Sequence, residues 1–383
     1  MKKIMIVGAG KTQVPLIKAA KMEGYHTVVC DKDPAAPGVA LADEFVRVST
    51  KDRDGLYRTA REKKIDGIVA NSEYAMCDVA AISSDLGLVG NPEEAIAVLS
   101  SKSKFRELQE KAGLFTPKKA EVEEVIVKPD MSSGTRGTTV VYNQAGMKDA
   151  VENCGRISRN GKAILEEYIT IDPETVIEGE IFINKGEVLW DGLFRSIRSK
   201  AAPMIPMTYV FPLDEERVDE LKAVLEAAFQ VAGVVHGEYN IEACFVGDDP
   251  FIIEINPRQG GNDLPKYVQE HCGIDYYRLL VTTSVGDDGY WRSLGEFERA
   301  NKRITHHMLY PRENGRFKGV WISSDIRNCV SRTHVDVNVG DRVEVAEDGS
   351  ASIGYVDLVF EDEQEQRVST RLEDQIRIKI DED

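Results

Sequence analysis

The sequence is poor in positive charge. Its 48 lysines and arginines stand against 65 aspartates and glutamates, which gives a formal net charge of −17 at pH 7. Proteins that bind nucleic acids need a basic face for the phosphates, so we expect no nucleic-acid partner. A polyanionic small molecule would have to be held by local lysines and arginines or by metal ions.

The sequence also lacks paired cysteines and long apolar runs. Its 6 cysteines are scattered along the chain, without the spacing of a zinc site or a disulfide framework. No apolar run approaches the length of a membrane span, and the first residues carry no signal-peptide cleavage pattern. We therefore expect a cytoplasmic protein that does not contact membranes.

The chain is long enough for several domains. It has 383 residues, and about two to four domains are expected at this length. Residues 1–98 alternate short apolar runs (IMIVG, HTVVCD, FVRVS, DGIVAN) with helical patterns, which predicts βαβ units and a parallel sheet. Ligands of such sheets bind beyond the carboxyl ends of the strands, here near Gly8, Asp31 and residues 71–73.

The glycine turn GAG at residues 8–10 lies between the first predicted strand and a helix. Such a turn can hold an anion at the helix N-terminus. It is not a P-loop, because Met5 stands where a glycine is needed, and Gln13 replaces the third small residue of a dinucleotide fingerprint. Asp31 does stand where a ribose-binding carboxylate would. The turn could therefore bind a nucleotide, hold a substrate carboxylate or be purely structural.

Three further zones follow. Residues 99–172 predict a helix, the strand EVIVKP, a loop of small residues, the strand TTVVY, a second helix and the strand AILEEYI. Residues 173–300 predict long strands (TVIEGEIFI, EVLWDGLF, HGEYNIEACFV, PFIIEINP) and one long helix. Residues 301–383 are rich in predicted strands and tight turns. The expected fold class is an open parallel α/β unit followed by α+β units and a strand-rich C-terminal segment.

The loop between EVIVKP and TTVVY has the composition of a phosphate-binding loop. Lys128 ends the strand before it, and the loop itself contains Ser132, Ser133, Gly134, Thr135, Arg136 and Gly137. Glycines let a backbone wrap closely around a ligand with its N–H groups turned inward. Lys128 and Arg136 supply positive charge that the chain otherwise lacks. On composition alone, a plain hairpin with a basic tip is equally compatible.

Two predicted strands, HGEYNIEACFV and PFIIEINP, meet around a glycine turn. We assume that Val246 pairs with Pro250. Counting along the strands then places Glu242 opposite Glu254, and the two-residue period puts Asn256 on the same face. Opposed carboxylates repel each other, so this face predicts a bound cation, and oxygen ligands favour Mg²⁺ or Mn²⁺ over zinc. A solvated acidic face with a slipped register is the alternative.

Taken in order, these segments resemble the ATP-grasp superfamily of carboxylate–amine ligases. The resemblance implies a pre-ATP-grasp domain (1–98), a first ATP-grasp subdomain with flap and hinge (99–172), a second subdomain with the metal strands (173–300) and a strand-rich C-terminal segment (301–383). It implies ATP between the two subdomains, with Mg²⁺ or Mn²⁺ as the metal ion.

The resemblance also implies roles for individual residues. The implied nucleotide contacts are Lys102 and Lys128 at the phosphates, the flap residues Ser132, Ser133, Gly134, Arg136 and Gly137, Glu166 at the adenine amino group, the hinge residues Glu167, Tyr168 and Ile169, and Glu174 at the ribose. The implied metal ligands are Glu242, Glu254 and Asn256. Lys128 and Arg258 are the implied catalytic cations, which stabilise developing negative charge.

The reaction implied by the resemblance is a two-step ligation. ATP phosphorylates a small-molecule carboxylate, and an amine, for which we predict an amino acid, then displaces phosphate from the acylphosphate. The alternatives are a carboxylase or carbamoyl-phosphate-type enzyme that uses bicarbonate, and a non-catalytic NAD-binding protein. By analogy with the family, we expect a homodimer through the first domain.

Overall fold

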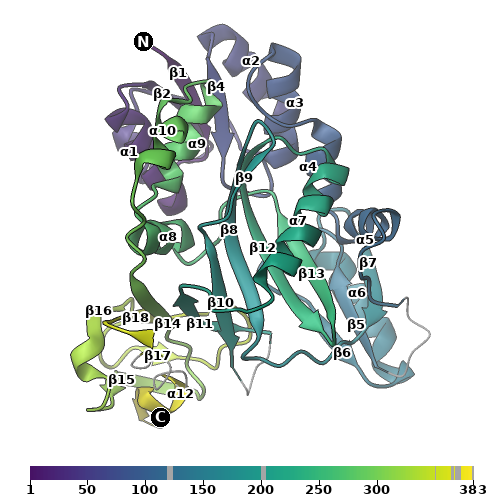
Figure 1. Ribbon diagram of the computed structural model, residues 1–383, viewed down its shortest axis with the longest axis vertical. Coiled ribbons are helices and arrows are strands. Elements are labelled where there is room, and N and C mark those ends of the chain that lie inside the picture. The colour runs from purple at the N-terminus through teal and green to yellow at the C-terminus, as the bar shows by residue number, and fades with distance from the viewer. Residues whose placement is uncertain (119–123, 200–203, 350, 364–365, 367–371, 382–383) are drawn as a thin grey trace.

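The computed structural model describes residues 1–118, 124–199, 204–349, 351–363, 366 and 372–381, and within them the chain forms four β-sheets (Figure 1). The first sheet is parallel, with the order β3-β2-β1-β4, which confirms the parallel α/β unit. Its elements are β1 (Lys3–Val7), α1 (Val14–Met22), β2 (His26–Asp31), β3 (Glu44–Arg47), α2 (Arg53–Lys63), β4 (Gly67–Ala70) and α3 (Met76–Leu86).

Helices cover both faces of the first sheet, which explains why its strands are almost continuously apolar. Ile4 and Ile6 of β1 pack in one core with residues of α1. Met5 and Val7 point to the other face and pack with α2 and α3. Helices from much later in the chain complete the first core: α8 (Leu264–Cys272), α9 (Tyr276–Ser284) and α10 (Gly289–Ser293). Figure 1 shows α9 beside α1, so the segment before residue 300 returns to the N-terminal sheet.

A small antiparallel sheet, β6-β5-β7, follows the helices α4 (Glu93–Leu99) and α5 (Lys102–Lys111). It consists of β5 (Val125–Pro129), β6 (Thr139–Val141) and β7 (Ala163–Glu167), and α6 (Met147–Ile157) packs on it. These elements match the expected order for this zone. Ser101 caps α5 by accepting a bond from the Lys104 N–H, and Gly113 follows the helix with a φ of 68°, as a C-terminal glycine does.

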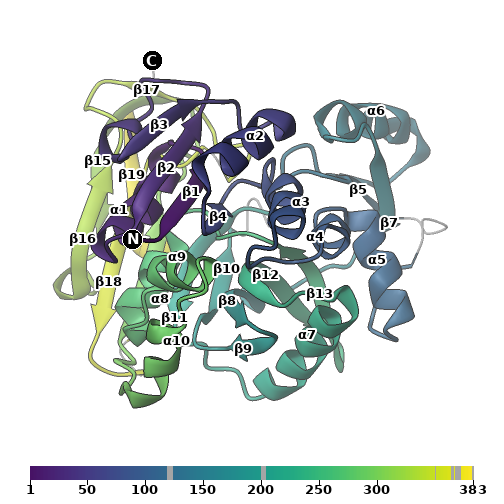
Figure 2. The same ribbon diagram turned by 90° about the horizontal axis from the view of Figure 1, so that it is seen from above.

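The large sheet is antiparallel, with the described order β13-β12-β8-β10-β11-β14-β18-β16, and β9 pairs with β8. Its strands are β8 (Val176–Asn184), β9 (Glu187–Leu189), β10 (Leu193–Arg198), β11 (Pro206–Phe211), β12 (His236–Val246), β13 (Asp249–Asn256), β14 (Arg303–Met308), β16 (Val330–Val335) and β18 (Gly354–Phe360). The helix α7 (Val218–Ala232) packs against its β12–β13 side (Figure 2).

One strand prediction for this sheet was wrong, and one strand was not predicted. The run EVLWDGLF is not one strand but two, β9 and β10, because the chain turns between them at Asp191 and Gly192 and Gly192 approaches Glu180 of β8 closely. The strand β11 was missed. In addition, β14, β16 and β18 extend the large sheet, so the expected boundary at residue 300 does not coincide with a break between sheets.

The last sheet has the order β17-β15-β19. It contains β15 (Gly315–Ile322), β17 (Arg342–Val343) and β19 (Ile376–Asp381), with α12 (Leu372–Gln375) before β19. Its apolar residues share a core with β18 of the large sheet. Among the helices of the described residues, none is long and apolar enough to cross a membrane.

Candidate active site

A cleft opens between the small sheet and the β12–β13 edge of the large sheet. Its space measures about 1090 Å³, including the part open to solvent, which is ample for a small-molecule ligand. Residues assigned to ATP and metal from the sequence line this cleft: Lys102, Lys128, Ser132, Gly134, Arg136, Glu166, Glu167, Tyr168, Ile169, Glu242 and Glu254. They come from α5, the small sheet, its loop and hinge, and the large sheet.

The remaining assigned residues lie near the cleft but do not line it. Asn256 lines a smaller hollow beside it, together with Lys102, Ser132 and Glu254. Ser133 and Gly137 belong to the loop that covers the cleft. Glu174 lies in the turn before β8 and Arg258 in the segment after β13.

The pairing of β12 with β13 at Glu242 and Glu254 is the predicted one, although the assumption behind it was wrong. Val246 pairs with Asp249 and not with Pro250, so the turn is one residue tighter than assumed. A β-bulge at Ile253 then shifts the register by one residue, so Glu242 lies opposite Glu254 as predicted.

The bulge also turns neighbouring residues of β13 to one side. In a regular strand, consecutive side chains point to opposite faces. Here Ile253 and Glu254 both line the cleft, while Ile252 and Ile255 are buried in the core beneath the sheet. Bulges commonly re-aim a side chain next to a binding site. One strand therefore supplies both an apolar wall and a carboxylate to the same cleft.

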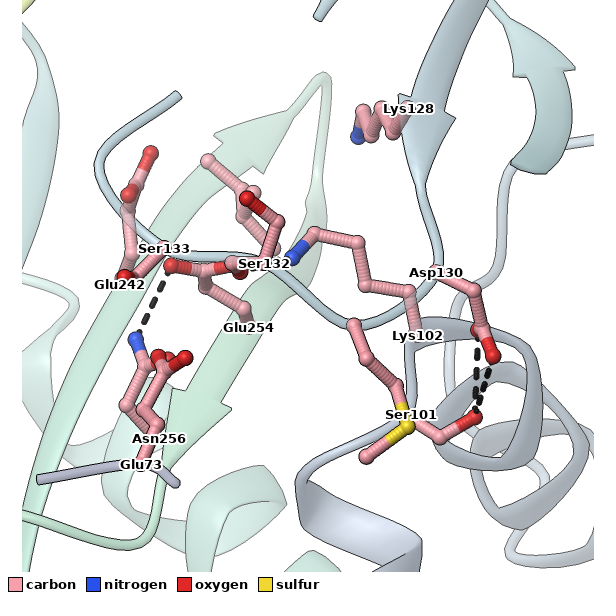
Figure 3. A network of polar contacts seen from close by, with 12 residues as sticks. Glu73, Ser101, Lys102, Lys128, Asp130, Ser132, Ser133, Glu242, Glu254 and Asn256 are labelled. Carbon is pink, nitrogen blue, oxygen red and sulfur yellow. Dashed lines mark hydrogen bonds and ion pairs between the residues drawn. The ribbon is translucent and has the colours of Figure 1, made fainter. Parts of the chain in front are cut away.

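Each of the opposed carboxylates has its own basic partner. The Lys102 ammonium lies 3.0 Å from Glu254 Oε2, and Arg198 forms an ion pair with Glu242. Figure 3 shows Lys102 reaching toward Glu254, with the Asn256 amide donating to Glu254 Oε1 at 2.9 Å. Burial disfavours the Glu254 carboxylate, but Lys102 and Asn256 outweigh it and lower the pKa of Glu254 to about 2. The repulsion expected from the sequence is therefore relieved by side chains of the protein.

A third carboxylate continues this row. Glu178 of β8 lies opposite Glu242, and Glu178 is only 6% exposed to solvent. Burial and the charge of Glu242 raise the pKa of Glu178 to about 8, against the opposing effect of Arg198, whose Nη2 is 3.7 Å from its Oε1. Sequence reasoning missed Glu178. The two-residue period in TVIEGEIFI carried the signal, because it aligns Glu178 with Glu180 on one face.

Lys128 is held by a buried ion-pair chain. Its ammonium lies 2.9 Å from Glu166 Oε2, and Arg106 Nε donates to Glu166 Oε1 at 2.6 Å. Burial opposes ionisation of Glu166, but Lys128 and Arg106 lower its pKa to about 2. The Glu166 carboxylate therefore faces these cations in this structure, and its predicted contact with the adenine amino group stays a prediction. Sequence reasoning did not find Arg106, although a charged residue on the buried face of α5 was a signal.

The loop from Ser132 to Gly137 folds over the cleft. Gly134, Thr135 and Gly137 have positive φ values of 68°, 61° and 77°, and glycine adopts such values without strain. The Thr135 hydroxyl donates to the Met204 carbonyl at 3.4 Å, so the loop touches the opposite wall. The Ser132 hydroxyl is buried without a hydrogen-bond partner among the described residues, and it is available to a ligand.

Glu73, at the carboxyl end of β4, joins the first domain to the site. Its Oε1 lies 3.3 Å from Arg258 Nη2, and its carbonyl accepts a bond from Arg159 Nη1 at 2.6 Å. The sequence pointed to residues 71–73 as a ligand-binding end of the first sheet. The structure brings them against Arg258, the predicted catalytic arginine.

Two N–H groups of the glycine turn at residues 8–10 are bonded within the protein. The Gly8 N–H donates to the Cys30 carbonyl at 2.7 Å, and the Ala9 N–H donates to Asp31 Oδ2 at 2.8 Å. The Gln13 side chain lies directly over Gly8. Asp31 thus takes up the position of an anion at this turn, which supports the structural interpretation.

Comparisons with known proteins agree with this architecture. No family model matches the chain. An uncharacterized protein, y4rH, of Sinorhizobium fredii (strain NBRC 101917 / NGR234) is 24% identical over 294 residues, which cover 71% of this chain and 61% of that protein. A formate-dependent phosphoribosylglycinamide formyltransferase of Prochlorococcus marinus (strain MIT 9303) is 27% identical over 46% of this chain and 50% of its own length. The matches thus span less than two thirds of each of these two relatives.

Solved structures match over nearly the whole chain. An L-amino acid ligase from Bacillus licheniformis superposes with a TM-score of 0.78 at 18% identity and covers 100% of this chain and 99% of that one. A phosphoribosylglycinamide synthetase from Anaerococcus prevotii has a TM-score of 0.72 at 21% identity, with 99% and 100% covered. These neighbours show that the chain has the ATP-grasp fold expected from the sequence.

Proposed function

We propose that the chain is an ATP-dependent ligase that joins a small-molecule carboxylate to an amine, with release of ADP and phosphate. One observation carries this proposal: a single cleft brings Lys102 and Lys128 together with the carboxylates of Glu242 and Glu254. Cations for a phosphate chain and oxygen ligands for a divalent metal ion are what a nucleoside triphosphate requires. The likeness to a ligase and a synthetase of the same fold supports it.

We infer that ATP lies with its phosphates between the two lysines and the loop from Ser132 to Gly137. The hinge residues Glu167, Tyr168 and Ile169 would border the adenine, and Glu174 would lie near the ribose. The ring would also meet the apolar wall of Phe251 and Ile253, which line the same cleft. In this arrangement the Glu166 carboxylate orients Lys128, since it contacts the ammonium directly.

The acidic residues fit a divalent metal ion. Glu242 and Glu254 are directly opposed and offer carboxylate oxygens. Asn256 turns its amide nitrogen to Glu254, and its Oδ1 is the atom that it would offer to a metal ion, so all the donors would be hard oxygen atoms. The low pKa of Glu254 keeps it ionised. We propose that these residues hold Mg²⁺ or Mn²⁺, which when bound neutralises charge on phosphoryl oxygens.

The residues of the chain act by position and charge in this scheme. A carboxylate oxygen of the substrate attacks the γ-phosphorus of ATP, the bond from that phosphorus to the β–γ bridging oxygen breaks, and ADP leaves. The amine nitrogen then attacks the acyl carbon of the acylphosphate, loses a proton and displaces phosphate. Lys128 and Arg258 supply fixed positive charge where negative charge develops. Glu73 holds Arg258 in place, and no side-chain nucleophile is required.

The substrate class we propose is an amino acid. The support is the L-amino acid ligase, whose whole length superposes on this chain. A second candidate is a one-carbon carboxylate. Relatives named formate-dependent phosphoribosylglycinamide formyltransferase favour formate, for example the one from Synechococcus sp. (strain WH7803), 28% identical over 302 residues. A relative named carbamoyl phosphate synthase large chain favours bicarbonate.

The test is a screen for ATP-dependent phosphate release with pairs of amino acids, and with formate or bicarbonate in place of the carboxylate. We expect ADP and phosphate with at least one amino-acid pair, and a hydroxamate when hydroxylamine replaces the amine. Turnover with formate or bicarbonate alone would favour the one-carbon candidate, and AMP with pyrophosphate would refute the mechanism. Tight NAD binding without any ATP turnover would support the non-catalytic alternative.

We also propose that the chain forms a homodimer through residues 1–98, by analogy with the family. A solved neighbour is described as a biotin carboxylase domain dimer from Hydrogenobacter thermophilus. Light scattering of the purified chain tests this, and a monomeric mass at working concentration would contradict it.

A further inference from the structure

The β-bulge in β13 is held by side chains of α5, a helix outside the sheet. β13 is an edge strand of the large sheet, and α5 lies along its free edge. Arg106 Nη2 donates to the Ile253 carbonyl at 2.9 Å and Nη1 to the Ile252 carbonyl at 3.4 Å. Gln109 Nε2 donates to the same Ile252 carbonyl at 3.0 Å. A bulge interrupts the regular ladder, so these bonds satisfy carbonyl groups at the irregular position.

The register would be different without the bulge. Near the turn, Val246 pairs with Asp249, and Ala243 pairs with Ile252. Continued without a shift, this register would place Ile253 opposite Glu242, and a one-residue slip moves every following side chain to the other face. Glu254 would then point into the core beneath the sheet. The bulge is therefore what brings the second carboxylate to the cleft.

The Arg106 guanidinium also contacts the side of the cleft where Lys128 lies. Arg106 Nε donates to Glu166, and Glu166 binds the Lys128 ammonium. Both members of the Arg106–Glu166 pair are buried, with side chains 9% and 6% exposed. Removing one partner of such a pair leaves an uncompensated buried charge. The position of Lys128 thus depends on Arg106 through one intermediate side chain.

We propose that Arg106 is a positioning residue that sets the metal strand and the phosphate-binding lysine together. Arg106 would touch neither ATP nor the metal ion. It acts on β13 through the Ile253 carbonyl and on Lys128 through the Glu166 carboxylate. This inference rests on the proposed function, because it assigns Arg106 a role in the same ATP and metal site. It requires arginine, since a planar guanidinium donates in several fixed directions and a lysine ammonium cannot reach all of these acceptors.

The test compares variants that break different parts of this arrangement. Arg106→Lys keeps the positive charge and loses the planar arrangement of several N–H donors. Glu166→Gln removes the charge of the carboxylate that Lys128 and Arg106 Nε share, and it leaves both Arg106 bonds to β13 in place. Gln109→Met removes the bond to the Ile252 carbonyl at the bulge, together with the bond that Gln109 Oε1 accepts from Arg106 Nη1 at 2.6 Å. Arg299→Met is the matched control. Arg299 Nε is 2.5 Å from Asp191 Oδ1, and its Nη1 donates to the Leu294 carbonyl at 2.9 Å. It thus binds a carboxylate and a carbonyl as Arg106 does, it does not line the cleft, and its side chain is more exposed, at 31% against 9%.

We expect Arg106→Lys to change two measured constants together. The Kd for ATP and the Mn²⁺ concentration that half-saturates the protein should each rise, roughly tenfold or more for the ATP constant. Glu166→Gln should raise the ATP constant with little change in the metal constant. Gln109→Met should raise the half-saturating Mn²⁺ concentration with little change in the Kd for ATP. Arg299→Met should change neither constant. If Arg106→Lys raised only the ATP constant, as Glu166→Gln does, the link to the bulge would be wrong. If Arg106→Lys and Arg299→Met behaved alike, Arg106 would be merely structural.

Hydrogen exchange of the ligand-free protein gives a readout that does not depend on ligase activity. Amides of residues 251–256 should exchange faster in Arg106→Lys and Gln109→Met than in the wild type or Arg299→Met. Unchanged exchange in this segment would overturn the inference even if the ligase reaction is confirmed. If the wild-type protein turns over no substrate but these amides still exchange faster in Arg106→Lys than in the wild type, Arg106 remains the support of the bulge and only the proposed function is refuted.

Discussion

Replacing Glu254 with glutamine tests the charge arrangement of the metal strands. The substitution keeps the size of the side chain and removes its charge. Two opposed carboxylates alone would predict a small gain in stability on neutralisation, because repulsion would be relieved. The structure reverses this sign. Glu254 lies 3.0 Å from the Lys102 ammonium, and Glu242 is neutralised separately by Arg198, so the substitution leaves Lys102 without its carboxylate.

The magnitude follows from the pKa of Glu254. A fall from the ordinary value of 4.5 to about 2 corresponds to at most about 3 kcal/mol. Because the side chain is 23% exposed, solvent screens the pair, and we expect roughly 1–2 kcal/mol. The folded-state pKa lies below the unfolded one, so this stability is fully present above the unfolded pKa. It is lost as the pH falls from about 4.5 toward about 2.

The assay is thermal unfolding of wild type and Glu254→Gln in metal-free buffer across this pH range. At pH 7 the variant should unfold at a temperature about 1–3 °C lower for a chain of this size, and the difference should vanish near pH 2. The control is Glu226→Gln on the exposed side of α7, which should unfold like the wild type. A variant as stable as the wild type at pH 7 would refute the pairing. Turnover should be lost and recover in part when Mg²⁺ or Mn²⁺ is raised.

Three further measurements test neighbouring parts of the chain. Lys128→Met should weaken ATP binding by roughly ten- to a hundredfold, since a charge-assisted contact is lost, and unchanged binding by calorimetry would remove Lys128 from the site. Amides of Ser132–Gly137 should exchange more slowly when ATP and Mg²⁺ are added, because a closing loop excludes water; equal rates would make the segment a hairpin tip. Asp31→Ala should cost about 1 kcal/mol of stability through the lost bond to the Ala9 N–H and leave the KM for ATP unchanged. A changed KM with unchanged stability would mean that the glycine turn binds a ligand.

The parts of the fold that follow from local patterns could be predicted from the sequence. The parallel first sheet was predictable because each of its strands is an apolar run between helical patterns, and both faces are covered by helices. The small sheet and its loop were predictable because Lys128 and the glycines mark the end of one strand and the flexible turn after it. The strand β11 was missed, and the break between β9 and β10 was hidden in a run that reads as continuous.

The basic partners of the carboxylates could not be predicted in the same way. Lys102 and Arg198 are far from Glu254 and Glu242 in the chain, and nothing in strand periodicity identifies which distant cation approaches which carboxylate. The prediction of a cation at this face was sound in its electrostatics, since opposed charges do need compensation. It did not consider that the protein itself could supply the compensating charges, and this changes the sign expected for Glu254→Gln.

The bulge in β13 is the one irregularity that the sequence could have disclosed. In a strict alternation, Phe251 and Ile253 on the cleft side would turn Glu254 toward the core. Ile252 packs in the core and Ile253 on the cleft wall, as strict alternation requires, and the alternation breaks at the next step, because Ile253 and Glu254 both line the cleft. Such an extra residue leaves carbonyl groups outside the regular ladder, so a donor must come from an adjacent element. Arg106, charged but set among the buried residues of α5, is that donor. An apolar alternation that breaks at a carboxylate therefore predicts a bulge. A buried arginine on the adjacent helix then predicts the side chain that holds the bulge.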